Sequence, residues 1–229
     1  MTFNEINTHK PRLKVLNKEQ MWSIHAAALE ILATTGFEMQ HRGARKMLLN
    51  AGCSMSPNGR IRMPAYLAED APNTAPKRIQ LHDQLGQKAM DVVDENCYYG
   101  TGSDTIFTFD LDTGKRRRTT IEDTANFAKL VDGLDNMDFA MSMSNPEDVP
   151  IDDLYVHVFA EMIKHTNKPI IFIADSGEDI RKIYDIACLV AGGEETLQQK
   201  PFLLNYSEAI SPLIYPENVI EKLIFCAQK

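Results

Sequence analysis

Apolar residues recur every three or four positions in residues 21–32, which is the spacing of one buried helix face. Asn17, with Gln20 three residues later, predicts a capping box at the start of this helix. Gly36 is placed to end the helix in a left-handed turn. Two shorter helical patterns follow, so we expect residues 1–76 to form an N-terminal helical segment.

Between residues 77 and 119 the apolar spacing changes to period two, which is typical of half-buried strands. The stretch "DTIFTFDLDTGKRRRTT" contains two such runs, and they are joined at Asp112-Thr113-Gly114. A short Asp- and Gly-containing junction between two runs is a hairpin signal. The pattern therefore predicts a β-hairpin segment over residues 77–119.

From residue 120 onward, apolar strands alternate with amphipathic helices. The strands begin near residues 137, 169 and 201, a spacing of roughly 32 residues that matches one βα unit. Strands this apolar are covered on both faces, which favours a parallel sheet. Such a sheet is either open and doubly wound or part of a closed barrel. No glycine-rich phosphate-binding motif follows a strand, which weakens the nucleotide-binding versions of the open sheet.

The last predicted strand is followed by one helix, which lacks a glycine stop and a polar tail. Three or four βα units cannot close a barrel, which needs about 250 residues. We therefore expect residues 120–229 to be the first βα units of a longer domain.

Composition narrows the classes of partner. The 229 residues are 44% hydrophobic and 24% charged, with a net charge of −8. An acidic surface repels phosphate backbones and anionic lipid, so we expect no nucleic acid and no membrane partner. The four cysteines form no C-x-x-C pair, which argues against a zinc or redox motif. The absence of an apolar leader and of a membrane-length apolar run favours a cytoplasmic protein.

Polar side chains directly follow the last apolar strand. In both parallel architectures, ligands bind at the carboxyl ends of the strands. Asn205, Ser207 and Glu208 occupy that position. We therefore expect Asn205 and Glu208 to bind substrate.

The two earlier strands end in polar residues as well, but each set has a structural alternative. Ser142, Ser144 and Asn145 follow the first strand, and Ser144 and Asn145 precede Pro146 and fit a turn. Asp175 and Ser176 stand where they can cap the next helix.

Tyr98 and Tyr99 stand together before a flexible Gly-Thr-Gly. Aromatic faces attract cations, and cages of such rings hold quaternary ammonium groups. The alternative is one tyrosine in the core and one at the surface. We include both as candidate substrate-binding residues. The spacing of the histidines, cysteines and serines yields neither a nucleophile constellation nor a metal site, so the catalytic residues stay unknown.

A series of segments resembles the trimethylamine methyltransferase family over nearly the whole chain, from about residue 13 onward. The order of the segments carries the match, since any one of them is weak alone. The most specific parts are Ala191-Gly-Gly-Glu194, Lys200-Pro201 and Ser211-Pro-Leu213. The segments are "IHAAALEILATTGFE", "LLNAGC", "RIRMPAYLAEDAPNTAPKRIQLHD", "DLDTGKRRRTTIEDTANFAKLVDGLDNMDF", "NKPIIF" and "AGGEETLQQKPFLLNYSEAISPL".

The resemblance implies an α/β fold, a (β/α)8 TIM barrel of which this chain supplies about half, preceded by the N-terminal helical segment and the β-hairpin. It implies a methyltransferase that moves a methyl group from trimethylamine or a glycine-betaine-like amine to the Co(I) of a corrinoid protein. Cobalamin is then carried by that partner, and no cofactor is bound directly. Such an enzyme contributes positioning rather than a nucleophile. Tyr98 or Tyr99 would lie near the cation, with Asn205 and Glu208 on the rim.

Two other functions fit the same residues. A metal-dependent TIM-barrel lyase would place Glu208 and Asp175 around a divalent ion, and a stoichiometric metal would identify it. A non-catalytic, truncated protein would bind a betaine-like ligand or dimerise, because an open half-barrel exposes strand edges and apolar surface. We accordingly expect a homo-oligomer, and the isolated chain can be inactive.

Overall fold

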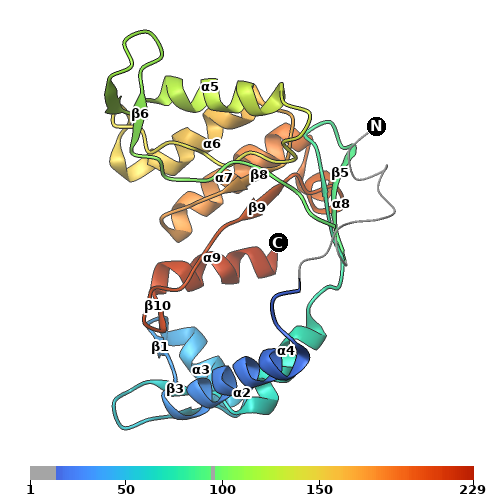
Figure 1. Ribbon diagram of the computed structural model, residues 1–229, viewed down its shortest axis with the longest axis vertical. Coiled ribbons are helices and arrows are strands. Elements are labelled where there is room, and N and C mark those ends of the chain that lie inside the picture. The colour runs from blue at the N-terminus through green and yellow to red at the C-terminus, as the bar shows by residue number, and fades with distance from the viewer. Residues whose placement is uncertain (1–13, 94–95) are drawn as a thin grey trace. The chain divides into compact units, whose positions relative to one another are not determined.

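The computed structural model describes residues 14–93 and 96–229, which form two compact units. We name residues 14–76 and 208–224 the helical unit, and residues 77–207 and 225–229 the parallel unit. Figure 1 traces the chain and labels its elements.

The helical unit begins with the capping box that the sequence predicts. The backbone amides of Asn17 and Gln20 each donate to the other residue's side chain, at 2.9 and 2.8 Å. Gly36 follows the helix with a φ of +68°, and a side chain there would collide with the Ile61 carbonyl. The predicted helix end is therefore confirmed. The elements of this unit are α2 (Lys18–Thr34), β1 (Glu38–Met39), α3 (Arg42–Asn50), β2 (Ser54–Met55), β3 (Ile61–Arg62), α4 (Ala65–Thr74) and β10 (Ile214–Tyr215).

Two segments that lie far apart in the sequence are joined in this unit. Strand β1 pairs in parallel with β10, and the Phe37 and Tyr215 rings meet edge to face, 5.3 Å apart. Arg60 donates to the carbonyls of Gly36 and Leu213 at 3.2 and 3.3 Å. Residues 208–224 are thereby tied to the N-terminal segment.

Four chain segments run parallel in the other unit, and we call them the parallel array. Gly100 bridges Phe139, and Ala140 bridges Ile170, both in parallel. Strand β8 then pairs in parallel with β9. The expected parallel pairing is confirmed, and the segment that begins at Gly100 extends it by one member. The elements of this unit are β4 (Ile79–His82), β5 (Lys88–Val92), β6 (Phe107–Phe109), β7 (Arg116–Arg118), α5 (Ile121–Asp132), η1 (Ile151–Asp153), α6 (Leu154–His165), β8 (Ile170–Phe172), α7 (Gly177–Ala191), α8 (Glu194–Gln199) and β9 (Leu203–Asn205); helix α9 (Glu217–Gln228) begins in the helical unit and ends here.

Helices connect the successive members of the array, because a chain that leaves one parallel strand must cross back before it starts the next. Helix α5 precedes the second segment, α6 precedes β8, and α7 with α8 precedes β9. Figure 1 shows α5, α6 and α7 lying side by side, and both neighbouring pairs are in contact.

The core of the parallel unit lies between these helices and the array. Phe159 and Met162 on α6 are 1% and 2% exposed, and Ile183 on α7 is fully buried. The Phe159 ring meets Phe172 of β8 edge to face, with centroids 5.6 Å apart. Apolar residues at helical spacing thus cover the strands, as the sequence pattern predicts.

The antiparallel hairpin of β4 and β5 lies at the amino edge of the array. The amide of His82 donates to the Pro201 carbonyl at 2.8 Å, and that of Gln84 to the Asn167 carbonyl at 2.9 Å. Both acceptors lie just before a strand, β9 and β8 respectively. Residues 77–119 therefore hold two hairpins, with the first parallel segment between them.

Replacing Phe159 with Ala tests this core. We expect a loss of about 3–5 kcal/mol in the free energy of unfolding, because a buried ring is removed and its cavity stays partly open. The matched control is Leu189→Ala on α7, since Leu189 is 81% exposed and such changes cost under about 0.5 kcal/mol. Urea unfolding followed by far-UV circular dichroism compares the two, and equal midpoints would contradict the assignment.

Candidate functional site

The ends of the four parallel segments supply the candidate site. Parallel strands all finish at one edge of a sheet, so the residues that follow them gather there. We call this set the strand-end rim. It comprises Gly102–Asp104, Ser142–Asn145, Ala174–Ser176 and Asn205–Ser207.

Backbone hydrogen bonds hold neighbouring parts of the rim together. The amide of Met143 donates to the Gly102 carbonyl at 3.1 Å, and that of Tyr206 to the Phe172 carbonyl at 2.8 Å. Asp104 and Met143 have φ angles of +54° and +47°. Such angles are unfavourable for residues with a side chain and are found preferentially at functional sites.

Tyr155, at the start of α6, contributes a phenol to the rim. Its hydroxyl donates to Asp104 Oδ1 at 3.3 Å. Burial raises the pKa of Tyr155 to about 12, and the negative charges of Asp104 and Asp175 add to that rise. The hydroxyl is therefore protonated at neutral pH and lies within the field of two carboxylates. That field favours a cationic ligand over an anionic one.

Two rim residues carry buried polar atoms with no hydrogen-bond partner in the described part of the chain. They are the Ser142 hydroxyl and the side-chain nitrogen of Asn205. Ser142 is 7% exposed, whereas the Asn205 carbonyl oxygen accepts from the Ser207 hydroxyl at 2.7 Å. Buried polar groups are nearly always paired in folded proteins. These two donors are therefore suited to a ligand that brings its own acceptor.

Other polar rim residues have structural partners. The hydroxyl of Ser144, fully buried, bonds with the hydroxyl of Thr124 on α5. The Ser176 hydroxyl accepts from the Asp179 amide at 3.1 Å and caps α7. The helix-cap interpretation of Ser176 is thus confirmed.

Tyr98 and Tyr99 lie at the start of the first parallel segment, at the edge opposite the rim. The Tyr98 hydroxyl accepts from the Asp91 amide at 2.8 Å, on strand β5. The Tyr99 amide donates to the Asp138 carboxylate at 2.7 Å, and the Tyr99 side chain is largely exposed. The structure therefore does not bring the tyrosines together with Asn205. Their role as cation ligands stays a prediction.

Glu208 is exposed and belongs to the helical unit, whereas Asn205 belongs to the parallel unit. The assignment of Glu208 to the substrate also stays a prediction. Tyr155 and Asp104 were not singled out from the sequence. Asp104 stands in the Gly-rich stretch after Tyr99, which was a signal for it, but Tyr155 looks like any aromatic residue on an amphipathic helix.

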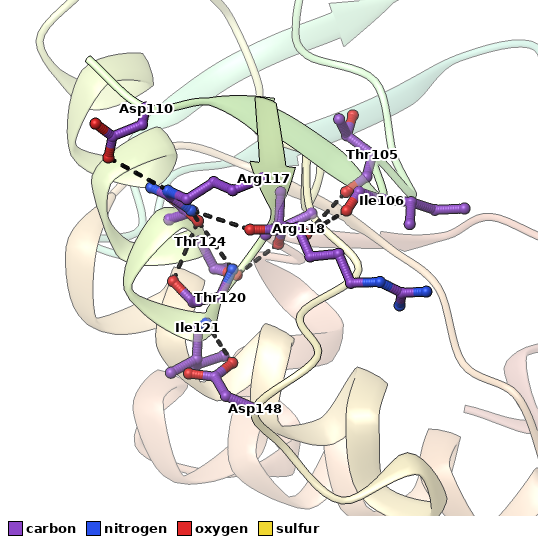
Figure 2. Close-up of polar contacts among 12 residues, drawn as sticks. Thr105, Ile106, Asp110, Arg117, Arg118, Thr120, Ile121, Thr124 and Asp148 are labelled. Carbon is purple, nitrogen blue, oxygen red and sulfur yellow. Dashed lines mark hydrogen bonds and ion pairs between the residues drawn. The ribbon is translucent and has the colours of Figure 1, made fainter. Parts of the chain in front are cut away.

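A β-hairpin, β6 with β7, rises from the rim between the first parallel segment and α5, and Figure 2 shows how its base is held. Thr119 is fully buried, and its hydroxyl contacts the carbonyls of Thr105 and Asn145 at 3.0 and 3.1 Å. Arg117 forms a two-pronged ion pair with Asp123 on α5, at 2.6 and 2.9 Å. The hairpin is thereby fixed to both the rim and the helix.

Within residues 14–93 and 96–229, no group of three or more His, Cys, Asp or Glu side chains is arranged to hold a metal ion. Among the described helices, none combines the length and hydrophobicity needed to cross a bilayer.

Comparison with known proteins relates the whole chain to one family. The family model described as Trimethylamine methyltransferase (MTTB) matches residues 1–229. A glycine betaine methyltransferase of Desulfitobacterium hafniense (strain Y51) is 26% identical over 219 residues, 95% of this chain and 45% of the relative. The trimethylamine methyltransferase MttB of D. hafniense (strain DSM 10664 / DCB-2) is 27% identical over 214 residues, 90% of this chain and 42% of the relative. MttB of Methanosarcina thermophila is 26% identical over 234 residues, 97% of this chain and 47% of the relative. The chain thus spans less than half the length of these relatives.

The ion pair between Arg117 and Asp123 gives a prediction for stability at acid pH. Hydrogen bonds from Arg117 chiefly hold the pKa of Asp123 below its ordinary value. A carboxyl whose pKa is lower in the folded state stabilises at neutral pH, and that contribution is lost as the pH falls through the folded pKa. We expect Asp123→Asn to be less stable at pH 7 and to lose less stability than the unaltered protein below about pH 4. Urea titrations between about pH 7 and pH 3 measure the free energy of unfolding, with the exposed neighbour Glu122→Gln as control. Parallel curves of this free energy against pH for the unaltered protein and Asp123→Asn would contradict the prediction.

The two buried serines of the rim give a matched pair. Ser144→Ala should cost about 1–3 kcal/mol, because the Thr124 hydroxyl loses its partner. Ser142→Ala removes a hydroxyl that has no partner in the described chain, so its stability should be unchanged or about 1 kcal/mol higher. Thermal and urea unfolding compare them. A larger loss for Ser142→Ala would show that this hydroxyl is already paired in the protein.

Proposed function

We propose, on the premise that this chain belongs to the trimethylamine methyltransferase family, that it is part of an enzyme for methylated amines. The enzyme transfers a methyl group from a tertiary or quaternary amine to the Co(I) of a corrinoid protein. The single observation that carries this proposal is the family match over the full 229 residues. The names of its relatives, glycine betaine methyltransferase and trimethylamine methyltransferase, support the substrate class.

The fold proposal is about half of a (β/α)8 barrel. Its support is the parallel pairing of successive segments, each reached through a helix. The share of the relatives that the chain covers, 42–47%, agrees with such a half. We propose that further βα units continue the array beyond β9.

The chemistry asks the protein to hold a cation and to aim one methyl group. A quaternary ammonium has no N–H to donate, so carboxylates and aromatic groups recognise it through charge rather than hydrogen bonds. Asp104 and Asp175 supply negative charge beside the protonated Tyr155. The attacking electron pair comes from the partner's cobalt. Among the described residues of the rim we identify no activated nucleophile, which fits a reaction whose nucleophile is the cobalt. The contribution of this chain is then to position the substrate.

The buried donors on the rim favour a substrate that also carries an acceptor. Ser142 and Asn205 each offer a hydrogen that the described chain leaves unpaired. A betaine carboxylate accepts such hydrogen bonds, whereas trimethylamine has no acceptor once its lone pair is protonated. We therefore propose a betaine-like amine as the preferred substrate. The corrinoid carrier is a separate protein, the enzyme is a cytoplasmic homo-oligomer, and the chain binds no cofactor of its own.

The test is methyl transfer by the protein at its native length, from glycine betaine and from trimethylamine, to free cob(I)alamin. We expect faster transfer from the betaine. Asn205→Ala should raise the KM for the betaine about tenfold or more, because a carboxylate hydrogen bond is lost, with a smaller effect on trimethylamine. The loss of the Co(I) absorption band records the reaction.

Gln87→Ala, an exposed amide in the turn between β4 and β5, is the matched control. No transfer from any methylated amine would refute the proposed function. An unchanged betaine KM for Asn205→Ala would remove that residue from the site. The double variant Tyr98→Ala, Tyr99→Ala tests the sequence-based cation site in the same assay, and a KM that does not rise would assign the cation to the rim.

A further inference from the structure

The two faces of the β6–β7 hairpin differ in composition. Residues directly opposite each other in an antiparallel pair share a face. Thr108 is paired with Arg117, and Arg117 reaches Asp123 on α5, so this face is turned toward the helix. The other face carries the pairs Phe107 with Arg118 and Phe109 with Arg116. We call these four residues the outward hairpin face.

The outward hairpin face exposes large apolar side chains. Phe109 is 68% exposed, and Leu111, in the turn just beyond it, is 100% exposed. The guanidinium of Arg116 lies over the Phe107 ring, 3.6 Å from its centroid. Aromatic and arginine side chains are enriched where proteins bind each other, and exposed apolar side chains that cluster mark such surfaces.

This face is presented by a hairpin with a fixed base. Thr119 ties the base to the rim carbonyls of Thr105 and Asn145, and Arg117 ties β7 to α5. Because the hairpin is already fixed, it loses little conformational freedom when a partner binds, which lowers the entropic cost of association.

The position of the hairpin selects the kind of partner. It joins the carboxyl end of the first parallel segment to α5, so it rises from the edge of the array that carries the rim. In Figure 1 it extends past the start of α5. A protein that brings a methyl acceptor to the rim has to approach this edge, and therefore comes near the hairpin.

Charge separates this partner from a second copy of the chain. Of the two guanidinium groups of this face, that of Arg118 pairs with the Glu147 carboxylate at 3.6 Å, whereas that of Arg116 lies over the Phe107 ring. A two-fold symmetric contact through this face would bring the two Arg116 guanidinium groups near each other, which is unfavourable. Nucleic acid is disfavoured by the net charge of −8. The face is suited to an apolar patch bordered by carboxylates.

We propose that the outward hairpin face, together with Leu111, is the docking surface for the separate protein that carries the methyl acceptor. The partner presents an apolar patch with an acidic border. This inference rests on the proposed function for the identity of the partner. The contact itself is independent of the chemical step.

The experiment uses the native-length protein, the cobalamin-loaded corrinoid protein of the source organism, and biolayer interferometry. The test variants are Arg116→Glu and the double variant Phe109→Ser, Leu111→Ser. We expect the Kd to rise about tenfold or more for each, because arginine and buried aromatic contacts dominate such interfaces. The Arg116→Glu effect should shrink as salt is raised, since it acts through charge. The matched control is Leu189→Ser, an exposed leucine on α7, which should leave the Kd within about twofold.

A kinetic readout separates docking from chemistry. Methyl transfer is measured to the corrinoid protein and to free cob(I)alamin, and the ratio of the two rates should fall about tenfold in the hairpin variants. Absent methyl transfer with hairpin-dependent binding would refute the proposed function and keep the docking surface. No binding by the unaltered protein, or a Kd indifferent to the hairpin variants, would overturn the docking surface. If the hairpin variants changed the oligomeric state of the protein in sedimentation, the face would be assigned to a contact between two copies of the chain. That result would overturn the docking surface as well.

Discussion

Parallel hydrogen bonding among the four segments of the array is the constraint on which the rest of this unit depends. Each parallel step obliges the chain to cross back through a helix, and α5, α6 and α7 are those crossings. All strand ends then fall on one edge and all strand starts on the other. The hairpin of β4 and β5 lies at the starting edge, while the polar residues of the rim gather at the other.

The same constraint explains how the candidate site and the outward hairpin face belong together. The insertion between the first parallel segment and α5 has to rise from the rim, because the strand ends there. Thr119 and Arg117 then turn that insertion into a fixed feature. A reaction whose electron pair comes from a separate protein needs both a pocket for the methyl donor and a surface for the carrier. Our proposals assign both roles to one edge of the array.

The charges and hydrogen-bond donors of the rim support a role in positioning the substrate. Burial, with the charges of Asp104 and Asp175, raises the pKa of Tyr155 to about 12, which places a neutral phenol beside negative charge. Within the described residues, Ser142 and Asn205 hold donors without a partner, at the ends of the second and fourth segments. Together they suit a molecule with a cationic and an anionic end, which is what distinguishes a betaine from a simple amine.

Local signals in the sequence were enough to define individual elements. The Asn17 capping box, the hairpin around Gly114 and the Ser176 cap are all present, because each depends on a few adjacent residues. The apolar face of α2 was predicted less well: Met21 and Ile24 are at least half exposed, because periodicity shows that a face is apolar but not that another element covers it.

The family, the βα repeat and the position of Asn205 at the end of a strand could all be inferred from the amino-acid sequence. Which polar residues share an edge became clear only from the folded arrangement of the strands. In the sequence Tyr98 and Tyr99 stand in a stretch that suggests a binding site, yet Gly100 bridges Phe139 in parallel, so the two tyrosines lie at the start of their segment. Asp104 and Tyr155 are 51 positions apart and meet at its end. The direction of each strand sets these positions, and direction follows from long-range pairing that no local pattern encodes.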